Sequence, residues 1–197
     1  KGREIGLRWL AEHRAELDTQ LPVRMQRLLN LQLQTLGQLD EHIEVLDAEI
    51  REMVAANALA KRLIKIPGIG PLGASALAST LGDGSGWRNA RQFASCLGLV
   101  PSHTGTGGKV RMGGISKRGD AYLRTLLVHG ARNLARLATP SVWVAGMLER
   151  RPFNVVATAV AHKLARIAWA IASHQRTYDP AWKPESPRGA PATTATA

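Results

Sequence analysis

The chain has 197 residues, of which 45% are hydrophobic, and a formal net charge of +11 at pH 7. This length is sufficient for one or two domains with a hydrophobic core, and the sequence has no run of about 18 uncharged apolar residues of the kind that spans a membrane. The single cysteine, Cys96, excludes an internal disulfide and a multi-cysteine zinc site, and it fits a reducing cytoplasm.

The first residues do not have the pattern of a signal peptide, because Lys1–Glu4 lack the order of charged and then apolar residues. They also lack an initiating methionine. We therefore expect the chain to be a fragment of a longer protein.

Residues 1–60 are predicted to form a helical, coiled-coil linker. Leucines at helical spacing mark a short amphipathic helix over 7–21, and Pro22 suits the first turn of the next helix. From Met25 to Met53, apolar residues follow alternating steps of four and three with one polar interruption at Gln32. This heptad seam predicts a helix of about 35 residues that packs as an antiparallel hairpin or a coiled coil.

The segment Ile66-Pro67-Gly68-Ile69-Gly70 resembles the turn of a helix-hairpin-helix DNA-binding motif. Such a turn leaves backbone N–H groups unpaired at the start of the second helix, and these groups and the helix dipole can hold a backbone phosphate. We therefore expect Gly68 and Gly70 to contact nucleic acid. The alternative is a tight turn between two packed helices that binds no ligand.

Positive charge is concentrated in residues 87–176, which contain 14 Lys and Arg but only 2 Asp and Glu. This imbalance is typical of a surface that faces a polyanion, and the alternative is a generally solvated basic surface. The patterns in this block predict short helices over 89–97 and 141–149, a helix from the N-cap Asp120 to Leu137, and a helix over 155–173 capped by Asn154. Residues 177–197, rich in Pro, Ala and Thr toward the end, are predicted to be disordered.

Residues 98–120 combine glycines with four hydroxyl side chains and four cations. Glycine lets a backbone approach a ligand closely, and backbone N–H groups together with Lys and Arg suit phosphate. The segment is expected to include a short β-hairpin with residues 109–112 as one arm. Its hydroxyl side chains also offer a candidate nucleophile.

Several motifs between residues 61 and 176 occur in the order of a known family. After Ile66–Gly70 come Trp87–Ser95, Gly98-Leu99-Val100-Pro101, Gly107-Gly108-Lys109 and Gly114–Arg124. With these motifs the segment resembles the C-terminal domain of the DEDD transposases of the insertion-sequence family one-ten, closest to its eleven-eleven subgroup. The helical segment before it resembles that family's coiled-coil linker.

The resemblance implies a DNA recombinase that excises and inserts its element. In this family an N-terminal RNase-H-like domain carries four acidic, metal-binding residues, and a structured bridge RNA selects donor and target DNA. That tetrad is not found in this sequence, so we expect this domain and its Mg²⁺ to lie outside the chain, and no metal site within it. The expected partners are DNA, bridge RNA and further copies in a dimer or tetramer, with no membrane, in the nucleoid-associated cytoplasm of a bacterium.

In this family a serine of the C-terminal domain is the nucleophile, and its position corresponds to Thr106. The resemblance implies that the Thr106 hydroxyl attacks a DNA phosphate and forms a phosphodiester to the protein. The alternatives are Ser102 or Thr104 as the nucleophile, a decayed element, or a shifted register of the loop. His103 and His129 are candidate proton carriers. The groups expected to bind nucleic acid, by neutralising the developing charge or holding flanking phosphates, are Gly68, Gly70, Lys109, Arg111, Ser116, Lys117, Arg118 and Arg124.

The sequence thus predicts a mainly α fold, in which a long coiled-coil helix or hairpin precedes a helical domain over 61–176 with the hairpin motif and the Gly-rich basic loop. The predicted function is that of a transposase part that binds DNA and bridge RNA and takes part in strand cleavage and transfer, inactive as a fragment alone. One alternative is a non-catalytic nucleic-acid-binding and dimerisation module, and another is a structural oligomerisation segment.

Overall fold

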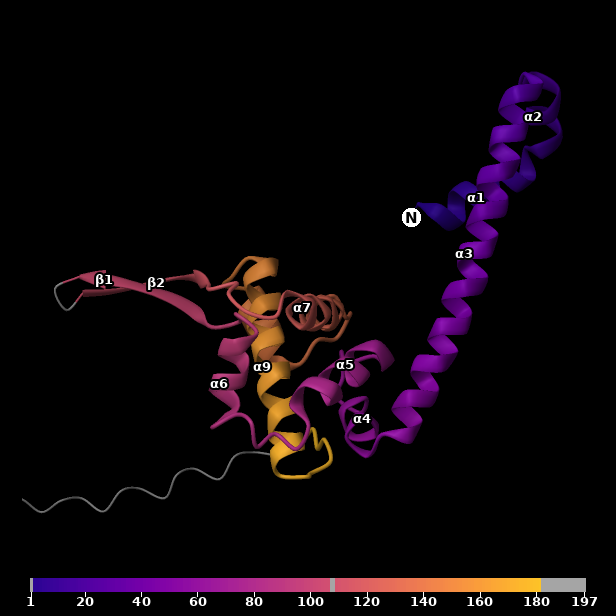
Figure 1. Ribbon diagram of the computed structural model, residues 1–197. Coiled ribbons are helices and arrows are strands. Elements are labelled where there is room, and N and C mark those ends of the chain that lie inside the picture. The colour runs from indigo at the N-terminus through magenta and orange to yellow at the C-terminus, as the bar shows by residue number, and fades with distance from the viewer. Residues whose placement is uncertain (1, 107–108, 182–197) are drawn as a thin grey trace, which may run out of the picture. The chain divides into compact units, whose positions relative to one another are not determined.

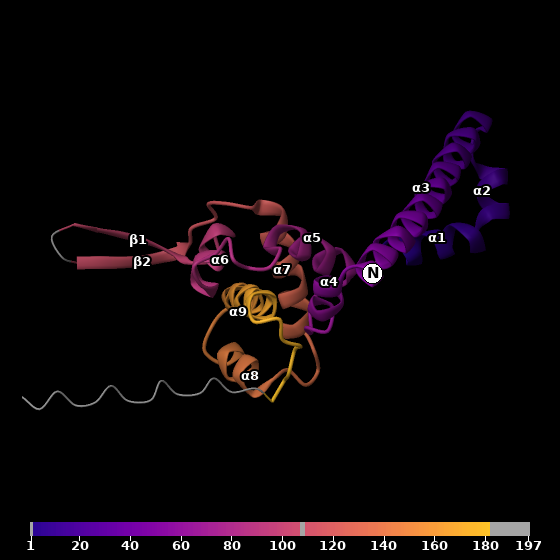
Figure 2. The same cartoon turned by 60° about the horizontal axis from the view of Figure 1, so that its bottom comes forward.

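The computed structural model of the chain describes residues 2–106 and 109–181. Within these ranges the protein has nine helices and one two-stranded sheet (Figures 1 and 2), which confirms the mainly α prediction. The contacts divide the chain into two units, Lys1–Glu49 and Ile50–Ala197. The predicted boundary at residue 60 falls inside the second unit, because Val54 is already buried in the core there.

The first unit pairs two short helices with one long helix, whereas the sequence predicted a single short helix over 7–21; the helix is interrupted at His13. Arg3 forms an ion pair with Asp40, and Arg14 donates a hydrogen bond to Asn30. These contacts hold the short helices against the N-terminal part of the long one, while the predicted seam beyond them stays more than half exposed at Leu39, Ile43 and Leu46. The elements are α1 (Arg3–Glu12), α2 (Arg14–Gln20) and α3 (Val23–Ala56), and the last turns of α3 belong to the second unit.

A helical hairpin opens the second unit and packs backbone to backbone against a later helix. It consists of α4 (Ala58–Leu63) and α5 (Pro71–Leu81), and its turn contains Gly68 in the left-handed region with φ +87°. The later helix is α7 (Ala121–Ala135). A Cβ atom on Gly130 of α7 would lie 1.8 Å from the carbonyl oxygen of Gly68. Two glycines therefore allow this close approach.

The Gly-rich segment forms an antiparallel ribbon, β1 (Pro101–Thr106) and β2 (Lys109–Ile115), after α6 (Ala90–Cys96). A backbone ladder extends from its base. Ser116 N–H donates to Val100 O at 2.8 Å, Lys117 N–H to Gly98 O at 3.0 Å, and Asp120 N–H to Cys96 O at 3.1 Å. Gly119 adopts φ +113°, and a Cβ atom there would lie 1.7 Å from Cys96 O. The ladder therefore requires glycine at this position.

Two long helices carry much of the core of the second unit. Asp120 caps α7 as predicted, since its side chain accepts a hydrogen bond from Leu123 N–H. The final helix, α9 (Phe153–Ser173), buries nine of its residues. The predicted cap Asn154 is wrong, because the extended backbone of Pro152 precedes the helix and places Asn154 in its first turn. Between α7 and α9 lies α8 (Val142–Leu148).

The end of the described chain and the apolar helix α9 both belong to this unit. Tyr178 packs against the core, and the rest of the predicted disordered segment from residue 182 lies outside the described residues. By length and composition α9 is apolar enough to cross a membrane, but half of its most apolar window is buried inside the unit. Its apolar side chains are accounted for by packing against the other helices.

Gly130→Ala tests the contact between the hairpin turn and α7. The added Cβ atom must displace the Gly68 carbonyl, so we expect the free energy of unfolding in urea to fall by roughly 1–3 kcal/mol. The matched control is Gly146→Ala in α8, whose Cβ atom would meet nothing within 4 Å. Because alanine is the better helix former, the control should gain up to about 1 kcal/mol. Equal effects of the two substitutions would contradict the close approach.

Candidate nucleic-acid interface

The ribbon places the predicted nucleophile and two predicted cations on one face. Thr106 pairs with Lys109, and Thr104 pairs with Arg111. Directly paired residues share a face of an antiparallel sheet, and so do residues two apart along one strand. These four positions therefore lie together on one face, at the outer end of the ribbon next to residues 107 and 108, which lie outside the described residues.

The other predicted binding residues of this segment lie at the opposite end of the ribbon. Five residues separate Pro101 from Thr106, a rise of about 17 Å along a strand. Ser116 is joined to the base of the ribbon through Val100, and Lys117 and Arg118 follow it. The structure therefore divides the predicted site into a ribbon group and a base group.

The two serine hydroxyls of the segment, Ser102 and Ser116, have described surroundings. The Ser102 hydroxyl donates a hydrogen bond to Gly114 O at 3.1 Å across the ribbon. This contact gives Ser102 a structural role at the base. Ser116 is half-buried. It lies in the loop before Asp120, the N-cap of α7, and is therefore not part of that helix.

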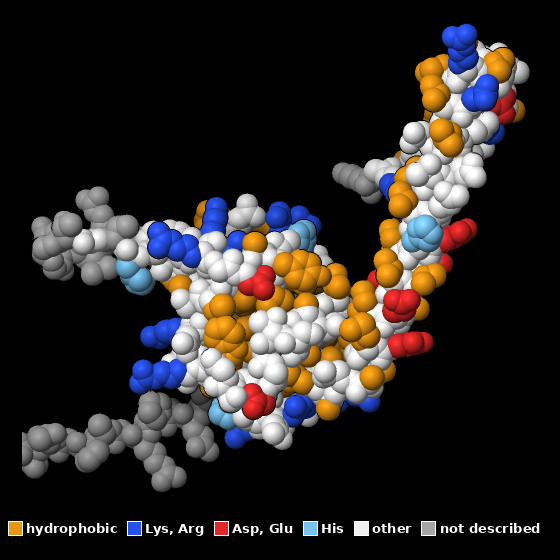
Figure 3. Space-filling view, viewed as in Figure 1, with side chains coloured by type: hydrophobic (Ala, Val, Ile, Leu, Met, Phe, Trp, Pro, Cys, Tyr) orange, Lys and Arg blue, Asp and Glu red, His pale blue; other side chains and the backbone are white. Residues whose placement is uncertain are grey.

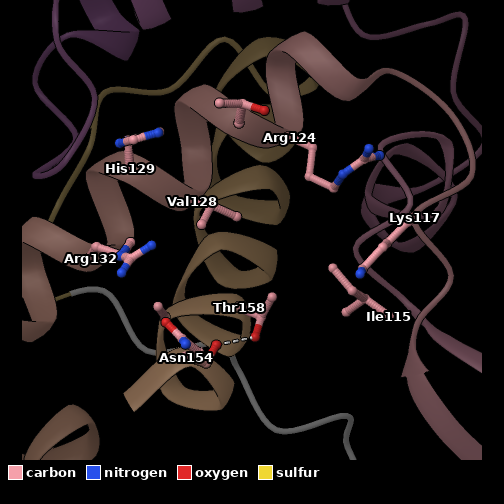
Figure 4. Close-up of a pocket in the computed structure, with 10 residues that line it drawn as sticks. Ile115, Lys117, Arg124, Val128, His129, Arg132, Asn154 and Thr158 are labelled. Atoms are coloured by element: carbon pink, nitrogen blue, oxygen red, sulfur yellow. Dashed lines mark hydrogen bonds between the residues drawn. The ribbon is translucent and has the colours of Figure 1, made fainter.

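A cleft of about 340 Å³ beside the base of the ribbon brings several cations together. Figure 4 shows Arg124 reaching from α7 toward the loop that carries Lys117, with Asn154 and Thr158 of α9 at the lower edge of the cleft. The ten described residues that line the cleft include no acidic side chain. They are Ile115, Lys117, Arg124, Thr125, Val128, His129, Arg132, Asn154, Ala157 and Thr158.

The cations of the cleft are positioned by neighbours that do not neutralise them. Arg124 donates a hydrogen bond to Leu97 O at 3.0 Å. The guanidinium of Arg132 lies 5.8 Å from the centre of the Phe153 ring. Each guanidinium has five N–H donors, so these contacts leave donors for a ligand. Sequence reasoning identified Lys117 and Arg124 but missed Arg132, because its proximity depends on how α7 packs against α9.

The hairpin turn lies beside a smaller cavity of about 200 Å³ between α5 and α7. In the described part of the chain, the N–H groups of Gly68 and Gly70 donate no hydrogen bond. The walls of this cavity are largely apolar and include Leu77, Leu126 and Leu127. Phosphate binding by the turn therefore stays a prediction.

A second cationic cluster lies between α6 and α9, and sequence reasoning did not single it out. His162 and Arg166 of α9 are one turn apart, and Arg91 of α6 lies close enough for its charge to act on His162. Burial lowers the pKa of the His162 imidazole below its ordinary value of 6.5, and the charges of Arg166 and Arg91 lower this pKa further. Figure 3 shows Lys and Arg side chains along the side of this unit that carries α6.

The described residues offer no ligand set for a metal ion. No group of three or more His, Cys, Asp or Glu side chains lies close enough together among them to bind one. The expectation that Mg²⁺ binds in a separate domain stays a prediction.

Residues 60–142 match the model of the family described as Transposase IS116/IS110/IS902. The chain is thus similar to this transposase family over that segment. The segment contains the hairpin, the ribbon, α7 and most of the residues of the cleft. The second cluster is shared between this segment, which holds Arg91, and the chain beyond it.

The similarity to individual transposases extends well beyond residues 60–142, the segment that matches the family model. A probable family 20 transposase of Pseudomonas aeruginosa is 44% identical over 91% of this chain and 55% of its own length. The transposase for insertion sequence element IS1328 of Yersinia enterocolitica is 47% identical over 77% of this chain and 47% of its own length. The transposase for insertion sequence element IS1111A of Coxiella burnetii is 39% identical over 80% of this chain and 45% of its own length. The chain thus spans about half the length of these relatives.

The lowered pKa of His162 predicts a pH-dependent stability of the protein that can be measured. The lowered pKa means that the unfolded chain binds a proton at a pH where the folded chain does not. The free energy of unfolding should therefore fall as the pH drops below about 6.5. In His162→Asn and His162→Gln, urea unfolding should show a smaller loss between about pH 7.5 and about pH 5.5. A loss equal to that of the wild type in both variants would contradict the lowered pKa of His162.

Proposed function

We propose that the chain is the carboxyl-terminal part of an insertion-sequence transposase that binds DNA and a bridge RNA and takes part in DNA strand cleavage and transfer. The observation that carries this proposal is the family segment over 60–142, in which a cleft holds three cations and no acidic side chain among its described lining residues. Uncompensated cations in a cleft favour a polyanion. The relatives named as transposases extend the likeness across most of the chain.

In this proposal the cleft binds phosphates of the nucleic-acid backbone. Lys117, Arg124 and Arg132 supply charge, and their donors suit phosphate oxygens. Such contacts position a nucleic acid without reading its bases. Arg118, exposed in the same loop, and the N–H groups of Gly68 and Gly70 extend the phosphate-binding surface.

The ribbon supplies the chemical step. The Thr106 oxygen attacks the phosphorus of a DNA phosphodiester and loses its proton, so that a bond from this oxygen to phosphorus forms. The bond from phosphorus to the 3′ oxygen of the strand breaks, and that oxygen takes up a proton. A 3′-hydroxyl of the partner strand then attacks the same phosphorus, which restores a DNA phosphodiester and the threonine hydroxyl.

The two groups of cations have different roles in this step. Lys109 and Arg111 share a ribbon face with Thr106, so they are the groups that neutralise charge at the attacked phosphate. Lys117, Arg118 and Arg124 belong to the base, about 17 Å away along the strand, and hold flanking phosphates. His129 lines the cleft, so it acts on bound phosphate and not on the Thr106 proton.

We further propose that the complete transposase is a homo-oligomer joined through α3. The exposed apolar residues of the seam, Leu39, Ile43 and Leu46, support this arrangement. A second copy would remove them from water, which is the favourable term in coiled-coil pairing. The acidic, Mg²⁺-binding domain of the family is proposed to complete the active site.

Lys117→Gln with Arg132→Gln tests phosphate binding in the cleft. Each lost phosphate contact reduces the dependence of log K on log salt by about 0.9 for duplex DNA, so the slope should become shallower by about 1.8. Fluorescence anisotropy at a series of salt concentrations measures it. The matched control, Arg24→Gln with Arg27→Gln on α3, removes the same charge and should retain the wild-type slope. A double cleft variant with an unchanged slope would remove the cleft from the binding surface.

Thr106→Ala tests the nucleophile in the complete transposase with its element DNA and RNA. The wild type should form a protein–DNA adduct that survives denaturation, and Thr106→Ala should form none, because the attacking hydroxyl is absent. Thr106→Ser keeps the hydroxyl and should keep the adduct, as should Ser102→Ala. Gel electrophoresis under denaturing conditions detects the adduct. If it persists in Thr106→Ala, another residue is the nucleophile, and if the wild type binds DNA without an adduct, the non-catalytic binding module is favoured.

A further inference from the structure

The exposed side of α9 carries a polar stripe that begins in the cleft and ends at the second cationic cluster. Asn154 and Thr158 line the cleft. His162 and Arg166 follow at the same spacing of four residues, and positions four apart neighbour one another on a helix. The buried residues of α9 are all apolar, and one of them, Ala157, lines the cleft beside Asn154 and Thr158. The cleft and the second cluster are therefore two ends of one continuous surface.

The far end of the stripe is built from two elements. Helix α6 packs against α9, and the positive charge of Arg91 on α6 acts on the His162 imidazole on α9. Neither Arg91 nor Arg166 forms an ion pair with an acidic residue of the described chain. His162 is half-buried, and its lowered pKa favours a neutral imidazole at pH 7. The cluster thus offers two charged groups and a neutral ring N–H donor, with nothing among the described residues to neutralise them.

The length of the stripe matches a run of several phosphates and exceeds the reach of a single ion. Twelve residues separate Asn154 from Arg166, which is about 18 Å along a helix. Successive phosphates of one strand lie about 3.4 Å apart along the axis of a duplex and farther apart in an extended single strand, so this length spans several of them. A free phosphate ion would occupy one end only, whereas a strand can occupy both.

We propose that one nucleic-acid strand follows the α9 stripe, with its phosphates held at one end by the cleft cations and at the other by Arg91, His162 and Arg166. This inference rests on the proposed nucleic-acid binding. It adds a second phosphate site and a path along α9 for the strand. Asn154 and Thr158 lie at the cleft end of the stripe, beside the cleft cations.

The experiment measures binding of the 197-residue chain to fluorescently labelled single strands of increasing length. Arg91→Gln with Arg166→Gln should reduce the salt slope by about 1.4, since each contact to a single strand contributes about 0.7. The loss should occur only with strands long enough to reach from the cleft to the cluster. Arg91→Lys with Arg166→Lys retains the charge and should keep most of the slope. Arg24→Gln with Arg27→Gln is the matched loss of charge elsewhere and should bind as the wild type does.

The outcomes separate this inference from the proposed function. If Lys117→Gln with Arg132→Gln reduces the slope while Arg91→Gln with Arg166→Gln leaves it at the wild-type value, strand tracking along α9 is overturned and cleft binding stands. An equal effect of the Arg91 and Arg166 changes on the shortest and longest strands also overturns the continuous path. If the wild-type chain binds strands without a salt slope, both proposals fail. Unchanged circular dichroism of each variant confirms that the fold is intact.

Discussion

The backbone ladder between residues 96–100 and 116–120 is the constraint on which the rest of the second unit depends. It holds the base of the ribbon, begins α7 at the Asp120 cap and fixes the loop that carries Lys117. It exists because Gly119 presents no Cβ atom to Cys96 O, and because Gly98 likewise lets the chain approach Arg118. The glycines of this segment therefore serve backbone packing first. In the proposed function, phosphate is bound by the cations that the ladder holds in place.

The sequence predicted the features that local physics determines. The heptad pattern identified α3, and the carboxylate of Asp120 identified the start of α7, because each depends on residues within one or two turns. The prediction of Asn154 as the cap of α9 was wrong although it also rested on a local preference. Pro152 fixes an extended backbone before the helix, and this overrides the capping preference of Asn154. The ribbon was predicted in part, with residues 109–112 as one arm, but its full register could not be read from composition.

Features that depend on packing between distant segments were beyond such reasoning. Arg132 joins Lys117 in a cleft because α7 lies against α9, and Arg91 joins His162 because α6 does. The charge imbalance of residues 87–176 predicted a surface that faces a polyanion. It could not identify which of the 14 Lys and Arg side chains lie close together in the folded chain. The ribbon changed the predicted site most, because its length separates Thr106 from the base cations, which the continuous motif had suggested would act together.

The distance between Thr106 and the base cations favours different roles for the firmly packed base and for the two-stranded ribbon. A two-stranded ribbon alone has little core to hold it, whereas the base is tied to α6, α7 and α9 by hydrogen bonds and buried side chains. Phosphate contacts need no more than a fixed array of cations, which the helices provide. A nucleophile must meet a phosphorus atom held by other groups, and a ribbon can enter such a site without disturbing the helices. Positive charge left unpaired on the helices repels itself in the free protein, and a strand bound along α9 would offset that repulsion at both ends of the stripe at once.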